Sequence, residues 1–267
     1  MVSPGGVAVV SAFAKLTLSL RITGVRSDGF HLLDAEMVTL DLADTLSIGE
    51  GDGLEISGAF AVDAGEDNLV RRALAAVGRV ARVQLEKRIP PGGGLGGGSA
   101  DAAAILRWAG VGVGGGVGGA ELELAAGLGA DVPFCLVGGR ARVLGIGEIV
   151  EPLPCAAGEP YTLLTPPLAV STVAAYRAWD AMGGPTADGP NDLEPAALAV
   201  APSLASWRDR LGDAAGVTPV LAGSGSTWWV PGAFPDVPGA VVARSVCPDG
   251  PGAAESMRPG GPGSMGA

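Results

Sequence analysis

The sequence predicts a folded protein of the α+β class, and two kinds of apolar spacing support this prediction. From Lys15 to Ile22 apolar and polar residues alternate strictly, which is typical of a half-buried β-strand. Between Leu69 and Val77 apolar residues recur at the spacing of one helix face. Hydrophobic residues make up 48% of the 267 residues, so the chain can bury a sizeable core in one large domain or two modest ones.

Similar patterns place further elements along the chain. Short strands are expected at 37–40, 45–48, 54–57, 82–89 and 161–164. Helices are expected from the cap Asn68 to about Val80, from the cap Ser99 to Trp108, at 121–128, at 172–182, and after a cap at Asn191 or Asp192. Asp44 is expected in a turn between two strands, and residues 221–227 in a strand–turn–strand hairpin.

Charge and composition exclude several classes of function. The net charge is −11 and no basic stripe occurs, so we expect no binding to nucleic acid. No run of 18 apolar residues occurs, and the N-terminus lacks the positive region of a signal peptide, so a soluble cytoplasmic protein without membrane contact is expected. The three cysteines are odd in number and fit no metal-binding spacing, so we expect neither a cysteine–metal site nor a disulfide framework.

The most informative stretch is a glycine-rich loop from Gly92 to Gly98, in which six of the seven residues are glycine. It follows a predicted strand and precedes a predicted helix. Backbone N–H groups of such a loop can approach an anion closely, and the helix N-terminus adds partial positive charge. The chain has 45 glycines, so an inert turn is the alternative, but the position of the loop favours an anion-binding site.

Two common forms of phosphate loop fit this stretch poorly. The mononucleotide form needs a lysine where Gly98 stands. The dinucleotide form can be drawn through Gly92, Gly94 and Gly97. Its acidic residue should end a strand, however, and Glu121 falls in a predicted helix.

The segment 90–103, PPGGGLGGGSADAA, resembles the ATP loop of the GHMP small-molecule kinases. Within that family it is most similar to the kinases that act on a cytidine diphosphate-linked methylerythritol. Further segments resemble family motifs in the same order along the chain: 14–18, 26–31, 67–69, 129–133, 138–148, 191–194 and 221–226. Because so many similar segments follow one another in the family's order, chance is a poor explanation of the match.

The resemblance implies both a fold and a reaction. The fold would have two lobes, one like the second domain of ribosomal protein S5 at 1–152 and one ferredoxin-like at 153–246, with a disordered tail at 247–267. The reaction would move the γ-phosphoryl group of ATP to the 2-hydroxyl of the cytidylyl-linked methylerythritol, in the non-mevalonate route to isoprenoid precursors. The protein would be a monomer or a weak homodimer.

The resemblance also assigns roles to individual residues. Asp131 would accept or orient the hydroxyl proton, and Lys15 would hold Asp131 ionised and stabilise charge on the phosphoryl group. The ATP-binding residues would be Asn68, Pro91, Gly92, Gly93, Gly94, Leu95, Gly96, Gly97, Gly98 and Ser99, with Ser99 also reaching Mg²⁺. The substrate-binding residues would be Thr17, Phe30, His31, Gly223, Ser224 and Gly225.

Three departures from the family pattern keep alternatives open. Thr17 stands in place of an asparagine, Phe30 in place of the commoner tyrosine, and Ala222 in place of a hydroxyl residue. One alternative is a family member that phosphorylates homoserine or a mevalonate derivative, although the segment ending in His31 argues against it. The other is a decayed homologue that holds nucleotide without turnover. By pattern alone, His31 is an ordinary structural histidine and Asp131 an ordinary turn cap.

Overall fold

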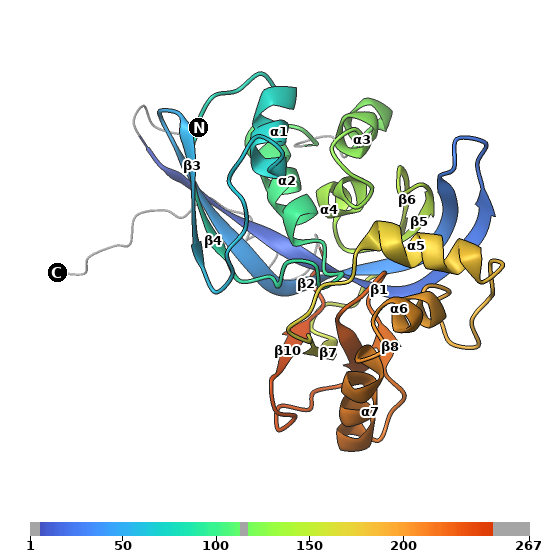
Figure 1. The fold of residues 1–267 in the computed structure, drawn as a ribbon. Helices are drawn as coiled ribbons and strands as arrows, with labels where there is room; N and C mark the ends of the chain where they lie inside the picture. Colours follow the sequence, from blue (N-terminus) through green and yellow to red (C-terminus); the bar gives the residue numbers. More distant parts are fainter. Residues whose placement is uncertain (1–5, 113–116, 248–267) are drawn as a thin grey trace.

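The larger of two lobes is built on a long, twisted sheet (Figure 1). The computed structural model describes residues 6–112 and 117–247. In the six-stranded sheet β1 pairs with β2, and the other strands follow the order β3-β4-β2-β5-β6. The strands are β1 (Ala8–Val25), β2 (His31–Gly49), β3 (Gly53–Gly58), β4 (Arg82–Lys87), β5 (Arg140–Gly145) and β6 (Ile149–Leu153).

Strand β2 is the central strand of this sheet, because it is long enough to pair with three other strands. It pairs antiparallel with β1 on one side, and on the other with β5 along its first half and β4 along its second half. The two strands expected at 37–40 and 45–48 are therefore a single strand. Asp44 lies within it and is fully buried, so its predicted place in a turn is wrong.

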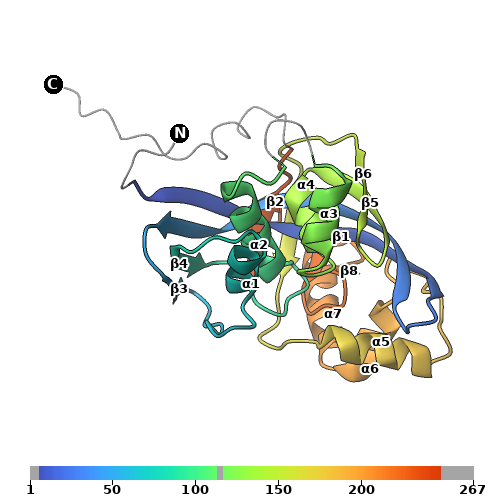
Figure 2. The same cartoon turned by 90° about the horizontal axis from the view of Figure 1, so that it is seen from above.

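Helices α1 to α4 lie along one side of the long strands, as Figure 2 shows from above. They are α1 (Leu69–Ala76), α2 (Gly97–Trp108), α3 (Gly119–Ala126) and α4 (Val132–Val137). Helix α2 contains an unbroken buried run from Ala100 to Leu106. Four of those seven residues are alanine, and their short side chains let the helix backbone approach strand β1 closely.

The smaller lobe lies on the opposite side of the long strands (Figure 1). Its four-stranded sheet has the order β10-β7-β9-β8. The elements are β7 (Pro160–Leu164), α5 (Thr172–Ala181), α6 (Glu194–Val200), α7 (Leu204–Ala215), β8 (Val220–Leu221), β9 (Trp228–Pro231) and β10 (Ala240–Arg244). The indole of Trp228 is fully buried in the core of this lobe. The predicted α+β class and the two lobes are confirmed.

Polar contacts join the two lobes beside the middle of β1. The backbone N–H of Leu20 donates to Pro190 O at 2.8 Å. The buried Asp192 carboxylate accepts from Arg21 Nη1 at 2.7 Å and from the N–H of Ile22 at 2.9 Å. The segment before α6 thus forms a parallel β-bridge with β1, between Asn191 and Leu20, which attaches the smaller lobe to that strand.

Several helix boundaries differ from the sequence prediction. The cap at Asn68 is confirmed, because its side chain accepts from the N–H of Val70 at 2.9 Å. Helix α1 ends at Ala76 rather than near residue 80, since Gly78 takes a left-handed conformation with φ +62° that stops the helix. Ser99 does not cap α2. The N-cap is Gly96, in a left-handed conformation, and Ser99 lies within the first turn.

Asn191 and Asp192 were expected to cap a helix, and this prediction is also wrong. Helix α6 begins at Glu194, with Leu193 at its N-cap position. Both side chains are buried. Asn191 Oδ1 accepts from the N–H of Leu193 at 2.9 Å, just before the helix, while its amide donates to Leu221 O and the Asp192 carboxylate accepts from Arg21, contacts that local sequence could not reveal.

A disulfide joins Cys155 and Cys247, contrary to the expectation from the cysteine count. Cys155 lies in the connection between the two sheets, and Cys247 follows β10. The third cysteine, Cys135, is buried in α4, where desolvation raises the pKa of its thiol to about 12. The odd cysteine count is therefore compatible with a disulfide, because two cysteines form the bond and Cys135 remains as a buried free thiol. Of the predicted tail, only Cys247 falls within the described residues.

None of the helices in the described ranges combines the length and the apolar character that crossing a bilayer requires.

Candidate active site

A cavity of about 930 Å³ lies where the two lobes meet. Its walls come from β1, the loop between β4 and α2, the start of α4, helix α5, and the turn between β8 and β9. The predicted site residues all contribute to this wall: Lys15, Thr17, Phe30, His31, Asn68, Pro91, Gly92, Gly93, Gly94, Leu95, Gly96, Gly97, Gly98, Ser99, Asp131, Gly223, Ser224 and Gly225. The fold therefore collects residues from segments spread over most of the chain.

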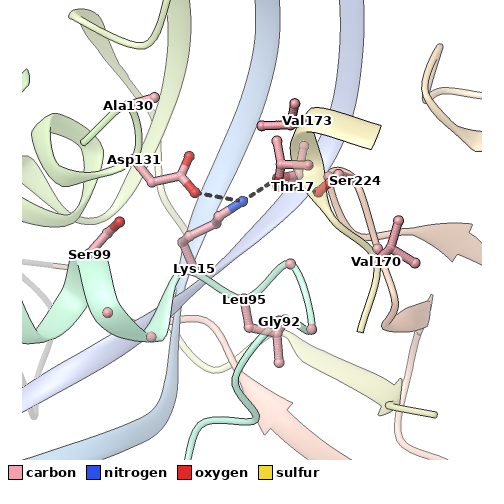
Figure 3. A pocket seen from close by; sticks show the side chains of 18 of the residues that line it. Lys15, Thr17, Gly92, Leu95, Ser99, Ala130, Asp131, Val170, Val173 and Ser224 are labelled. Carbon is pink, nitrogen blue, oxygen red and sulfur yellow. Dashed lines mark hydrogen bonds and ion pairs between the residues drawn. The ribbon is translucent and has the colours of Figure 1, made fainter. Parts of the chain in front are cut away.

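The centre of the cavity is an ion pair between Lys15 and Asp131 (Figure 3). Lys15 Nζ lies 3.4 Å from Asp131 Oδ2 and donates to Thr17 Oγ1 at 3.0 Å. Lys15 and Thr17 project from the same face of β1, because side chains two positions apart in a strand share a face. The alternation of polar and apolar residues in this strand predicts that the polar face meets solvent, but both side chains are buried.

Asp131 differs from its partner in exposure. It occupies the N-cap position of α4, and its side chain keeps 34% of its accessible surface, against 5% for Lys15. The carboxylate therefore lies at the cavity surface, where it can contact a bound molecule. The ammonium below it is held by Asp131 and Thr17, and the main chain at Lys15 is fixed to the glycine-rich loop, because its N–H donates to Leu95 O at 3.0 Å.

The glycine-rich loop passes directly over Lys15, and this contact explains two of its glycines. A Cβ atom at Gly96 would lie 2.8 Å from Lys15 Cγ, and one at Gly94 would lie 2.0 Å from Ala222 O. Both residues also have positive φ, +69° and +77°. A side chain at either position would push the loop away from the ion pair or from the turn between β8 and β9.

Helix α2 begins where this loop ends, without a side chain to cap it. Its first N–H groups therefore have no partner within the helix, and they carry the positive end of the helix dipole. Ser99 lies in this first turn and lines the same cavity, as Figure 3 shows. A free helix N-terminus that follows a glycine loop is well suited to hold phosphate groups.

A second glycine turn, Gly223 to Gly225, completes the wall beside Lys15. A Cβ at Gly223 would lie 3.5 Å from Lys15 Nζ. The amide of Asn191 donates to Gly223 O at 2.7 Å and to Leu221 O at 2.8 Å, so the buried side chain fixes the turn from behind. Ser224 Oγ lies 2.9 Å from Thr172 Oγ1, which links the turn to helix α5.

At the other end of the cavity His31 lies against helix α5. Its Nε2 is 2.8 Å from Asp180 Oδ1, and its ring stacks on Tyr176 with 4.6 Å between centroids. The neighbouring Phe30 is 58% exposed and makes no aromatic contact within the described part of the chain. This end thus offers flat apolar surfaces together with a polar ring edge.

Sequence reasoning missed a buried ionic cluster beneath the glycine loop. Lys87 Nζ contacts Asp44 Oδ2 and donates to Asp101 Oδ2 at 2.8 Å. The other oxygen of Asp44 accepts from the N–H of Ile89 at 2.8 Å, at the entrance to the loop. Lys87 and Asp101 flank the loop in sequence, so the cluster ties its two ends together. The assignment of Asp44 to a turn hid this contact.

The cluster holds two carboxyl groups and one ammonium away from water. Desolvation, opposed by the Lys87 charge, raises the pKa of the Asp101 carboxyl to about 7. Its Oδ1 is buried and has no hydrogen-bond partner among the described residues. The Asp101 carboxyl can therefore be protonated or ionised near neutral pH.

Comparisons with known proteins agree with this geometry. Residues 68–139 match the N-terminal domain of the GHMP kinases. A 4-diphosphocytidyl-2-C-methyl-D-erythritol kinase of Paracoccus denitrificans is 38% identical over 256 residues, which cover 88% of this chain and 90% of the relative. The chain belongs to the GHMP kinase family.

Other relatives within the family support the same branch. A kinase of the same name from Moorella thermoacetica is 40% identical over 79% of this chain and 74% of its own. The crystal structure of a 4-(cytidine 5'-diphospho)-2C-methyl-D-erythritol kinase is 31% identical, with a TM-score of 0.70 over 88% of this chain and 98% of that one. A homoserine kinase from Cytophaga hutchinsonii, 19% identical with a TM-score of 0.60, shares the fold alone.

Proposed function

We propose that this GHMP kinase transfers the γ-phosphoryl group of ATP to the 2-hydroxyl of 4-diphosphocytidyl-2-C-methyl-D-erythritol. The observation that carries the proposal is the Lys15–Asp131 pair, 3.4 Å apart, beside a glycine loop and an uncapped helix N-terminus in one cavity. The names of the similar kinases support the choice of acceptor. The products would be ADP and the 2-phosphate, an intermediate in the non-mevalonate route to isoprenoid precursors.

The mechanism follows from the positions of the two charged groups. Asp131, at the cavity surface, orients the acceptor hydroxyl and takes its proton as the oxygen attacks the γ-phosphorus. Lys15, which forms an ion pair with Asp131, stabilises negative charge on the transferring phosphoryl group. Thr17 contributes by fixing the Lys15 ammonium in one direction.

The ATP phosphates would lie on residues 91–99, where backbone N–H groups and the start of α2 face the cavity. No group of three or more acidic, histidine or cysteine side chains among residues 6–112 and 117–247 could hold a metal ion by itself. Mg²⁺ at kinase sites needs only one or two protein oxygens besides phosphates and water, and Ser99 Oγ in the cavity wall fits that requirement. When bound, Mg²⁺ would neutralise charge on the phosphates.

The test of the catalytic pair is Asp131→Asn. Loss of the general base should lower kcat by about 10²–10⁴-fold with little change in the melting temperature, because the amide keeps the size of the side chain. Asp213→Asn, on the exposed face of α7, is the matched control for the change in charge. A variant of Asp131 with near-normal kcat would remove this residue from the mechanism.

The identity of the acceptor needs a separate measurement. ADP release should depend on the cytidylyl-linked alcohol and should not be stimulated by homoserine or mevalonate. CDP should inhibit in competition with the alcohol. Binding of ATP with no ADP release in the presence of any of these alcohols would instead indicate a nucleotide-binding homologue without turnover.

We also propose that the domain boundary falls near residue 152 and that the enzyme works in the cytoplasm. Strand β6, the last of the larger sheet, ends at Leu153, and β7 begins the smaller sheet at Pro160. Cytoplasmic location is what a biosynthetic kinase that uses ATP requires. Fractionation of cells that express a tagged full-length chain tests the location.

A further inference from the structure

Besides His31, two lysines and one arginine among the described residues line the cavity, and both lysines are already paired with carboxylates. Lys15 faces Asp131, and Lys87 lies between two buried aspartates. The third is Arg177 on helix α5. Its side chain is exposed and makes no hydrogen bond or ion pair with any residue that the structure describes. Its guanidinium is therefore the one charge in the described wall that is free to meet a ligand.

The neighbours of Arg177 place it between the two ends of the cavity. The first residue of helix α5 is Thr172, which contacts Ser224 in the second glycine turn near Lys15. The other end of α5 holds Tyr176 and Asp180, which contact His31. Asp180 lies three positions from Arg177 on the helix, but it is engaged by His31 and does not neutralise the guanidinium.

The charge of the protein makes a free cation at this position significant. With a net charge of −11, the chain as a whole repels anionic molecules. The phosphates of ATP can use the amides of the glycine loop and the N-terminus of α2. The second substrate of the proposed reaction also carries a diphosphate, between its cytosine and its alcohol. Nothing else in the described wall offers that diphosphate an unpaired positive charge.

We propose that Arg177 binds the diphosphate of the second substrate and thereby makes the enzyme select a nucleoside diphosphate-linked alcohol. This inference rests on the proposed function and adds the residue that recognises the linking group. A guanidinium presents a planar fork of N–H donors that matches two phosphate oxygens, which an ammonium cannot do. Arg177 acts in binding and not in the transfer itself.

The test compares ligands that differ only in phosphate. The affinities of CDP, CMP and cytidine are measured by titration calorimetry for the parent, Arg177→Gln and Arg177→Lys. Arg177→Gln should weaken CDP by about tenfold or more, as expected for the loss of charge-assisted hydrogen bonds, and cytidine by no more than about twofold. Arg177→Lys should fall between the two for CDP. The KM for ATP should stay unchanged.

Arg79→Gln is the matched control, because Arg79 is exposed and lies outside the cavity wall. It makes the same change in net charge and should leave all three affinities unchanged. Equal losses for CDP and cytidine in Arg177→Gln would overturn the proposal, since the residue would then only support the shape of α5. No loss for either ligand would overturn it as well.

The outcome is separable from that of the proposed function. A parent protein that binds CDP in an Arg177-dependent way without any kinase activity would contradict the proposed reaction alone. A parent that phosphorylates the cytidylyl-linked alcohol, with an Arg177→Gln variant of unchanged KM for that alcohol, would contradict the role of Arg177 alone.

Discussion

Reduction of the Cys155–Cys247 disulfide should lower the stability of the protein without changing its active site. The two cysteines are 92 positions apart, and the segment between them contains every helix and strand of the smaller lobe. The bond therefore reduces the number of conformations that this long segment can adopt in the unfolded chain. In the folded chain both ends are already held, since the backbone N–H of Val246 donates to Thr39 O at 2.9 Å and Ser245 Oγ donates to Ala156 O at 2.6 Å.

The magnitude follows from the length of the closed segment. The chain-entropy relation for a loop of this length gives about 4–5 kcal/mol at 25 °C, an upper value because the unfolded chain keeps some structure. The assay is urea unfolding followed by tryptophan fluorescence, with and without dithiothreitol. The Cys247→Ser variant should unfold at the same urea concentration as the reduced parent, and dithiothreitol should not affect it.

Two results would refute this reasoning. Identical unfolding midpoints for oxidised and reduced parent would show that the bond contributes nothing. Titration of three free thiols in the unreduced, denatured protein would show that it does not form. Neither cysteine lines the cavity, so kcat at 25 °C should be unchanged by reduction.

Other predictions concern the cavity wall. Gly94→Ala would place a Cβ 2.0 Å from Ala222 O at a positive φ, so we expect a loss of about 1–3 kcal/mol in stability and a raised KM for ATP, measured by thermal unfolding and steady-state kinetics. His31→Ala should raise the KM for the cytidylyl substrate while sparing the KM for ATP, because the ring lies at the far end of the cavity against Tyr176; equal effects on both would contradict this. Asp101→Asn should change the pH dependence of stability. Burial raises the pKa of Asp101 from 3.8 to about 7, so the folded state keeps a proton that the unfolded state releases in that window. Stability from this group is therefore present below about pH 4 and is lost as pH rises to about 7, by up to ~4 kcal/mol. Thermal unfolding of parent and variant from pH 5 to 8 should show a steeper decline for the parent; parallel curves would contradict the assignment.

Local features of this chain could be predicted because they depend on neighbours in sequence. The alternation in β1, the cap at Asn68 and the glycine-rich stretch before α2 each reflect a backbone conformation that a few adjacent residues decide. The boundaries were less predictable. Gly78 ends α1 early, and α2 begins after Gly96 rather than after Ser99. Glycine and serine can both stand at a helix boundary, and the packing around each residue decides which of them does.

The sequence alone determined that this chain carries a glycine-rich loop, a lysine strand and an aspartate segment in the order of a kinase family. The tertiary structure alone decided that Lys15 meets Asp131, that Asp44 closes a buried cluster under the loop, and that Arg177 has no polar partner among the residues described. Those contacts arise when strand pairing and lobe packing bring distant segments together. Local propensity cannot specify them, because each depends on the register of a sheet or the docking of a helix far away along the chain.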